Sequence, residues 1–569
     1  MVLKFQNPRN PKLGLVHRWC SSITLSAWIL GGLSIALLLP SLAADFYSDD
    51  YYFYWLTHHQ LEPYIQNNKP RVLDYFTFLT DNPERTSALI ALGMTPWWIE
   101  PTTQLHFFRP LTELTHAIDF ALFSSRLPMF LHSLLWYCLL LALSVRIYSR
   151  LLKPPSLVLL AFTLFVLSAH ASLTLSWIAN RNALIATVFL LLALSNYLTF
   201  LQSLRKWSLI LSLCFWAAAL LSAEVAVSGV PVFIAFLFCR YRSLSHSAIG
   251  LAALPLIIVI VWLLFYLGYG FGAWSGSGYY VNIFTQPYEF LAVFIQRASE
   301  AILLQLTGLP DTLIVNQPNT PIVASALGLS LAIVIYQMKQ PALWGLLFLW
   351  LVSLIPILSV EVQSRNLLFP TLFIAPLLAT IIVHAFTCKH LTFPRLFLLL
   401  FATLLLTMHG FFALLLKPVN AYAYKIQSQQ QTELIQSLPK LTKPTFVLGN
   451  DVFDQTAMIG GRFYHGFNDE YPLINLVTQT QGLIIEPLPN GLRLRSIQGL
   501  LSERDLLFRL RFEVGQQFTL FHNTTIQIEA INRQGIPTSI QVTTDTPYHV
   551  FIYRGGIFHA LRLPATSAR

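Results

Sequence analysis

Long apolar stretches separated by short polar segments make up most of the chain. A helix needs about 20 apolar residues to cross a bilayer, and about eleven stretches approach or exceed that length. The pattern therefore predicts a polytopic α-helical membrane protein with about eleven spanning helices. The fifth and sixth stretches meet at Glu224, so about ten or twelve helices fit as well. The stretches cover residues 21–43, 128–148, 155–174, 183–202, 207–223, 225–239, 247–268, 319–337, 342–360, 366–387 and 395–415.

The pattern changes after residue 416, where the apolar stretches stop. Residues 417–439 contain the polar run Gln427–Gln431 and predict a helical connector. Short segments rich in β-branched and aromatic residues follow, separated by turn signals. We therefore predict a transmembrane domain over residues 1–416 and a β-rich α+β or all-β domain over residues 417–569. The predicted strands are Thr445–Leu448, Gly482–Ile485, Leu506–Phe512, Gln517–Phe521, Thr525–Ile528, Ser539–Thr543 and His549–Tyr553.

Basic residues in the short loops predict the orientation, because lysine and arginine there stay on the cytoplasmic side. With the N-terminus inside, residues 44–127, residues 269–318 and everything after residue 416 lie outside. We therefore expect a multi-pass protein of the bacterial inner membrane with a periplasmic C-terminal domain. The basic residues that then lie inside are Lys4, Arg9, Lys12, Arg18, Arg146, Arg150, Lys153, Arg205, Lys206, Arg240, Arg242, Lys339, Lys389 and Arg395.

The composition agrees with the membrane assignment and limits the kinds of binding partner that the chain can have. With 55% hydrophobic and 11% charged residues, the chain cannot fold with one water-soluble surface. The net charge of +10 is spread over the predicted cytoplasmic loops and forms no single basic face, which argues for membrane lipids and against nucleic acid as partners. None of the five cysteines falls in a predicted exported region, so no external disulfide framework is implied.

An acidic cluster follows the first apolar stretch. Asp45, Asp49 and Asp50 come directly after a run without charge from Trp19 to Ala44. The loop they open is rich in aromatic residues and includes Trp97-Trp98. Because such residues favour the headgroup layer, we expect the loop to lie along the membrane surface as short amphipathic helices over a membrane-level cavity.

The other predicted exported turns also carry charge close to the bilayer. Arg109 lies in the first loop, Arg181 follows the next exported turn, Glu224 lies between two apolar stretches, and Arg365 lies in the last turn. Charged residues in such positions indicate an outer vestibule of mixed charge.

The order of these landmarks resembles that of the GT-C superfamily of integral-membrane glycosyltransferases, especially bacterial members with an Asp-Asp loop after the first helix. Animal O-mannosyltransferases with tetratricopeptide tails and, more distantly, protein mannosyltransferases also look similar in the first half of the chain. The resemblance covers roughly residues 20–390. Its landmarks are Asp49-Asp50, Arg109-Pro110-Leu111, Trp177-Ile178 through Arg181, and Gly278-Tyr279-Tyr280-Val281. It implies a polyprenyl-phosphate-linked sugar as donor and an exported glycan, lipid or protein as acceptor. The absence of tetratricopeptide repeats and of a Trp-Trp-Asp signature argues against the animal subgroup and against an oligosaccharyltransferase.

Inverting transfer from a lipid phosphate needs a base and a group that binds the phosphate. A carboxylate takes the proton of the acceptor hydroxyl, and Asp49 or Asp50 can do so. The other carboxylate can position the acceptor or bind a divalent cation such as Mg²⁺ or Mn²⁺. The planar fork of arginine suits phosphate, and the candidates in order are Arg109, Arg181 and Arg365.

Each assignment has a simpler alternative. The Asp pair can cap the next helix through backbone N–H groups, and the arginines can reach to lipid headgroups. Glu224 either marks a tight exported turn or points into the cavity. Two other functions remain open: a lipid or glycan transporter or flippase, and a non-catalytic envelope-assembly protein. Charges around one outer groove favour transfer, charges at mid-depth favour transport, and no cluster favours assembly.

Overall fold

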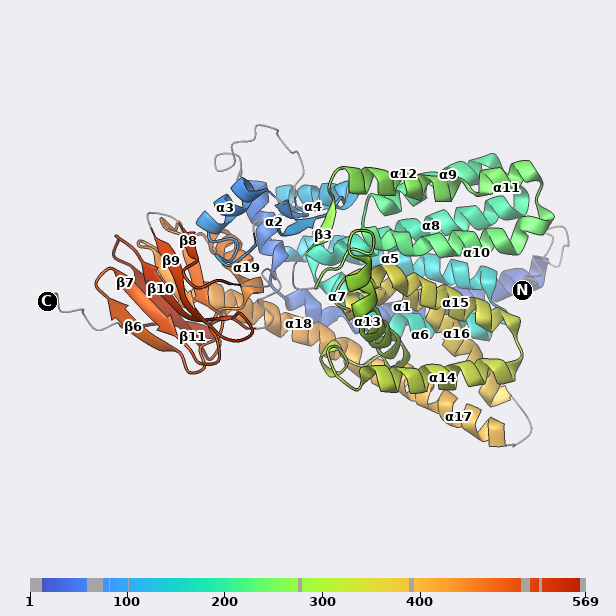
Figure 1. The fold of residues 1–569 in the computed structure, drawn as a ribbon. Coiled ribbons are helices and arrows are strands. Elements are labelled where there is room, and N and C mark those ends of the chain that lie inside the picture. The colour runs from blue at the N-terminus through green and yellow to red at the C-terminus, as the bar shows by residue number, and fades with distance from the viewer. Residues whose placement is uncertain are drawn as a thin grey trace.

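The computed structural model describes residues 13–58, 75–80, 82–100, 102–274, 279–387, 393–502, 512–520 and 524–562. A helical bundle forms one end of the molecule and a β-rich domain forms the other (Figure 1). The first helix begins at the end of the bundle that is remote from the β-rich domain (Figure 1). The helices and the strands therefore occupy separate parts of an elongated molecule.

The bundle confirms the prediction of a polytopic helical membrane protein. Within the described residues, ten helical segments are long and apolar enough to cross a membrane, and a pair bent by 53° would make eleven. The helices of these segments are α1 (Leu13–Ala36), α5 (Arg126–Leu151), the bent pair α6 (Pro155–Leu167) and α7 (His170–Ser176), α8 (Arg181–Ser203), α10 (Val230–Arg240), α11 (His246–Ala252), α12 (Leu254–Gly268), α13 (Pro287–Thr307), α14 (Thr320–Met338), α15 (Pro341–Leu354), α16 (Leu368–Thr387), α17 (Phe393–Leu406) and α18 (Ala413–Gln436).

The set differs from the predicted one at two helices. Helix α13 is long and apolar enough to span, yet it lies in the segment 269–318 that the sequence pattern assigned to the exported side. The pattern missed it because polar residues interrupt its apolar surface. Arg297, for example, donates to the backbone carbonyls of Leu358 and Tyr279 at 2.9 and 3.0 Å. Conversely, α9 (Lys206–Leu220), in a predicted spanning stretch, has only 15 residues.

Helix α18 joins the bundle to the β-rich domain without a break at residue 416. Its Lys417 is fully buried, and the ammonium group donates to Ser34 Oγ at 2.7 Å and to the Tyr137 hydroxyl at 3.1 Å. A third hydrogen bond goes to the backbone carbonyl of Val166. These bonds satisfy a cation inside the bundle and tie α18 to α1, α5 and α6.

The C-terminal part contains two sheets, with strand orders β12-β11-β4-β5 and β6-β7-β10-β9-β8. Strand β4 runs parallel to both neighbours, and α19 (Val452–Tyr464) follows it, so this part is α+β. The strands overlap all predicted ones except Leu506–Phe512, of which residues 506–511 lie outside the described residues. The strands are β4 (Thr445–Leu448), β5 (Leu473–Val477), β6 (Ile484–Leu488), β7 (Gly491–Arg495), β8 (Gln517–Thr519), β9 (Thr525–Ile531), β10 (Pro537–Thr543), β11 (His549–Arg554) and β12 (Ile557–Ala560).

The loop after α1 packs against the C-terminal part. Trp97 and Trp98 are buried in the core of the two sheets, where the Trp97 indole N–H donates to the Leu476 carbonyl at 3.3 Å. Their expected place at the membrane surface is therefore wrong. The described elements of this loop are α2 (Asp49–His58), β1 (Thr77–Thr80), α3 (Pro83–Ala91), β2 (Gln104–His106) and α4 (Pro110–Leu122); β1 and β2 form a three-stranded sheet with β3 (Gly272–Trp274).

Helix α19 holds the start of this loop in place. Gly460 lies so close to α2 that a Cβ atom there would be 2.4 Å from the backbone oxygen of Tyr51. From α18, Gln431 accepts the backbone N–H of Ser48 at 2.7 Å. The position of the acidic residues therefore depends on the C-terminal third of the chain.

Candidate functional site

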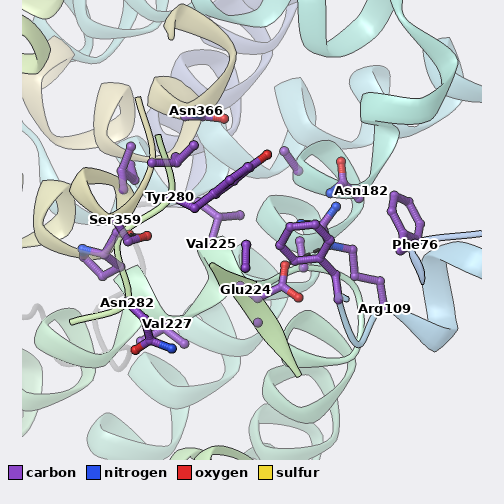
Figure 2. Close-up of a pocket in the computed structure, with 18 of the residues that line it drawn as sticks. Phe76, Arg109, Asn182, Glu224, Val225, Val227, Tyr280, Asn282, Ser359 and Asn366 are labelled. Carbon is purple, nitrogen blue, oxygen red and sulfur yellow. Dashed lines mark hydrogen bonds and ion pairs between the residues drawn. The ribbon is translucent and has the colours of Figure 1, made fainter. Parts of the chain in front are cut away.

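A cavity of about 360 Å³ lies between the first loop and the helical bundle. Most of its wall is apolar and aromatic, and the charged residues on it come from separate parts of the chain (Figure 2). Pockets of this size with a few polar groups on an apolar wall are typical of small-molecule sites. The lining residues include Asp49, Arg109, Trp177, Asn180, Asn182, Glu224, Trp262, Tyr266, Phe290 and Arg365.

Asp49 is the first residue of α2, and its side chain lines the cavity. Burial raises the pKa of this carboxyl group from 3.8 to about 6, while the nearby charges of Arg365 and Arg109 act in the opposite direction. A carboxylate with a pKa near the working pH can accept a proton and release it again. Asp49 therefore has the position and the chemistry of a general base.

Asp50 is adjacent in sequence but does not line the cavity. It is fully buried, and its two oxygens accept the backbone N–H groups of Ala179 and Tyr47 at 2.8 and 3.1 Å. Burial raises its pKa to about 7, partly offset by these hydrogen bonds. The structure thus separates the Asp pair. The backbone N–H groups that Asp50 accepts come from the segment before α2 and from η3 (Ile178–Asn180), and not from the first turn of α2 that the simpler alternative expected it to cap.

Arg109 and Glu224 form an ion pair on the cavity wall (Figure 2). The Nε atom of Arg109 lies 2.7 Å from Glu224 Oε2, and the guanidinium group lies 4.4 Å from the centre of the Phe107 ring. Tyr266 donates to the other oxygen of Glu224 at 3.2 Å. Glu224 therefore points into the cavity, and it neutralises the first candidate for phosphate binding.

Arg365 also lines the cavity but has no acidic partner within ion-pair distance among the described residues. It belongs to the short helix η8 (Ser364–Leu367), and its guanidinium group lies 4.7 Å from the centre of the Trp177 ring. Stacking on an aromatic face leaves the edge N–H donors of an arginine able to bind an anion. Arg365 is therefore better placed for a phosphate than Arg109.

Arg181 lies outside the cavity. It is fully buried and pairs with Asp119 at 2.5 Å, and it also donates to Ser133 Oγ and the Met129 carbonyl, each at 2.7 Å. His132 contacts the same carboxylate of Asp119 at 2.8 Å. These contacts join α4, α5 and α8, so we assign Arg181 to the stability of the bundle.

Several lining residues were not singled out from the sequence. Asn180 and Asn182 flank Arg181, and Trp262 and Tyr266 lie on α12. The sequence could have indicated Asn180 and Asn182 as cavity residues, because they lie at a predicted exported turn between Trp177 and the apolar stretch 183–202. The aromatic residues gave no comparable signal, since such residues are common throughout this chain.

The residues present do not fit a divalent cation. No group of three or more His, Cys, Asp or Glu side chains in the described part of the chain is placed to hold a metal ion. Of the two carboxylates that line the cavity, Asp49 and Glu224, the second is engaged by Arg109 and Tyr266. The chemistry discussed below therefore uses side chains alone.

Together, these side chains can support the transfer of a chemical group from a donor whose leaving group is an anion. The cavity combines a carboxylate that can take a proton, an arginine without an acidic partner, and apolar walls. Searches with protein-family models and against curated proteins give no match to the chain. What the protein does therefore has to be inferred from the cavity itself.

Proposed function

We propose that this protein is a GT-C-type membrane glycosyltransferase. It would transfer a sugar from a polyprenyl-phosphate donor to an exported glycan, lipid or protein, with inversion at the anomeric carbon. The observation that carries the proposal is that Asp49 and Arg365 line the same cavity. One can take the proton of an attacking hydroxyl, and the other can hold the phosphate that leaves.

The proposed step balances without a cofactor. The acceptor oxygen forms a bond to the anomeric carbon from the face opposite the phosphate, and its proton passes to Asp49. The bond between the anomeric carbon and the phosphate oxygen breaks, and its electron pair leaves with the polyprenyl phosphate. Arg365 stabilises the charge that develops on this phosphate, because a guanidinium group can bind two of its oxygens together.

The walls of the cavity suit a lipid-linked donor. Trp262, Leu263 and Phe290 come from the apolar helices α12 and α13, where a prenyl chain could lie beside the phosphate. The β-rich domain and the loop after α1 lie at the same end of the bundle (Figure 1). This arrangement supports an acceptor site at that end of the bundle, which we propose to be the periplasmic side of a bacterial inner membrane, with the N-terminus in the cytoplasm.

The alternative functions fit the distribution of charge less well. Asp49, Arg109, Glu224 and Arg365 gather around one cavity, which favours transfer over transport or assembly. Lys417 is also buried in the bundle, but hydrogen bonds hold it there and it does not line the cavity. No observation favours a second function.

The proposal can be tested with purified protein in proteoliposomes. Wild type should release polyprenyl phosphate from at least one member of a panel of polyprenyl-phosphate hexoses and pentoses, supplied with candidate acceptors. Asp49→Asn should abolish release. Asp45→Asn is the matched control, because Asp45 is in the same loop but does not line the cavity. No release from any donor, or full activity in Asp49→Asn, would refute the proposal.

A further inference from the structure

Two amide side chains on the cavity wall lack partners within the protein. Asn182 is only 6% exposed, and its Oδ1 atom has no hydrogen-bond partner. The Nδ2 atom of Asn180 is also buried without a partner. Both residues line the cavity, and Figure 2 shows Asn182 on the same side of it as Arg109 and Phe76. A buried polar atom without a partner is costly, so a ligand group that reaches such an atom gains a hydrogen bond there.

The local fold places both amide residues on the cavity wall. Asn180 is the last residue of the short helix η3 (Ile178–Asn180), and Asn182 is the second residue of α8. Arg181 between them is held by Asp119 outside the cavity. Asp50 also holds this turn, because its carboxylate accepts the backbone N–H of Ala179. The amides are thus fixed in position by two carboxylates that are not themselves part of the wall.

The chemistry of the two amides selects the kind of ligand group. Each amide offers a donor end and an acceptor end, whichever way it is turned. A hydroxyl group both donates and accepts, so it can satisfy either the Nδ2 of Asn180 or the Oδ1 of Asn182. With Asn182 oriented as it is in the structure, a phosphate oxygen, which only accepts, would leave its Oδ1 atom without a donor. The amides therefore suit a neutral hydroxyl, in contrast to Arg365.

We infer that Asn180 and Asn182 bind a hydroxyl group of a saccharide and so contribute to sugar specificity. The inference rests on the proposed function, because it takes the ligand to be a sugar substrate. The hydroxyl can belong to the donor sugar or to a sugar acceptor, and both present the same chemistry. Aromatic lining residues such as Trp177 and Trp262 supply apolar faces beside the amides, as sites for neutral ligands commonly do.

Binding measurements on the full-length protein in nanodiscs test this inference. The donor arm compares citronellyl phosphate with citronellyl-phosphate hexoses and pentoses, and the acceptor arm uses the corresponding methyl glycosides. In wild type, the sugar should increase affinity in at least one arm. Asn182→Ala should lower the affinity for the sugar-bearing ligand about threefold to tenfold, because this is the contribution of one neutral hydrogen bond. The affinity for citronellyl phosphate should stay unchanged. Asn180→Ala should lower the affinity in the same way. Because the two substitutions are independent, a folding defect in one of them would not invalidate the test.

Asn196→Ala is the matched control, because Asn196 is on the same helix but donates to the Leu192 carbonyl and does not line the cavity. It should keep wild-type affinity in both arms. If both cavity variants keep the full contribution of the sugar in both arms while citronellyl phosphate still binds, the amides do not read the saccharide, although the proposed function stands. If wild type binds neither the phosphate nor any sugar, the proposed function fails and this inference fails with it.

Discussion

The Oδ1 atom of Asp50 lies 2.8 Å from the backbone nitrogen of Ala179 and accepts its hydrogen bond. This bond connects the first turn of α2, which presents Asp49, to the turn that presents Asn180. The second oxygen of Asp50 accepts the N–H of Tyr47, just before that turn. Asp50 therefore sets the position of Asp49 relative to the turn that bears Asn180.

Replacing Asp50 should separate positioning from proton transfer. Asp50→Asn keeps an oxygen that can accept the Ala179 N–H, so it should retain most of the transfer activity. Asp50→Ala leaves buried N–H groups without acceptors, each at a cost of about 1–3 kcal/mol, and kcat should fall at least about tenfold. Steady-state kinetics with the best donor measures both. If Asp50→Asn were as inactive as Asp49→Asn, the carboxylate of Asp50 would itself be required, and a purely positioning role for Asp50 would be refuted.

The pKa of Asp49 predicts the pH dependence of transfer. Burial raises this pKa above its usual value to about 6, and only the deprotonated form can accept a proton. kcat/KM should therefore rise as the pH increases through about 6 and then level off. Because the charge of Arg365 lowers this pKa, Arg365→Gln should move the midpoint to higher pH. A pH profile that is flat through this range in wild type would contradict the assignment.

Arg365 should contribute more to donor phosphate binding than Arg109 does. Arg365→Lys keeps the charge but loses the planar fork, so affinity for undecaprenyl phosphate should fall about tenfold or more. Arg109→Lys should lower this affinity less, because the guanidinium group of Arg109 is already paired with Glu224. Titration of both variants in nanodiscs gives the ranking. A larger loss in Arg109→Lys would return the phosphate role to Arg109.

The buried pair of Arg181 and Asp119 should matter for stability. Arg181→Met leaves the Asp119 carboxylate buried without its arginine, and breaking such pairs costs about 3–5 kcal/mol. Thermal unfolding in detergent should show a clear fall in Tm. Lys440→Met is the control, because its pair with Glu470 is largely exposed and should contribute at most about 1 kcal/mol. Equal effects of the two substitutions would show that Arg181 has no special structural role.

Gly460 should link the C-terminal part to activity. A Cβ atom at this position would lie 2.4 Å from the Tyr51 oxygen, so Gly460→Ala must push α19 away from α2 and displace Asp49. We expect at least about a tenfold loss of turnover with correct membrane insertion. In Gly250→Ala the new methyl group meets no atom within 4 Å, so turnover should stay normal. Normal turnover in Gly460→Ala would mean that α19 does not position the base.

Much of the fold could be predicted because membrane crossing and strand formation leave strong local patterns. The strand Thr445–Leu448 has the predicted bounds, and most spanning stretches match helices. Helix α13 was missed because Arg297 and Glu300 are polar, and each has a partner outside the helix. Arg297 donates to the Leu358 carbonyl, and Glu300 accepts the backbone N–H of Asn316. The local pattern cannot reveal that such groups are paired inside the protein.

The candidate site could be predicted only as a set of residue types. Asp49 and Asp50 are neighbours, and only the three-dimensional arrangement shows that one lines the cavity while the other binds backbone N–H groups. The same holds for the arginines. Arg109 meets Glu224 across 115 residues of sequence, and this pairing decides which guanidinium group remains without an acidic partner.

Trp97 is synthesised long before Leu476, the residue whose carbonyl it binds 379 positions later. Synthesis starts at the N-terminus, so Trp97 and Trp98 cannot be buried in their core until the C-terminal strands have been made. Contacts between residues so far apart in sequence also form slowly. The spanning helices can insert earlier, since each satisfies its own backbone in the bilayer. Maturation of the loop that bears Asp49 is therefore expected to be the last event in the biogenesis of this protein, and a chain arrested before its final domain would be inserted but immature.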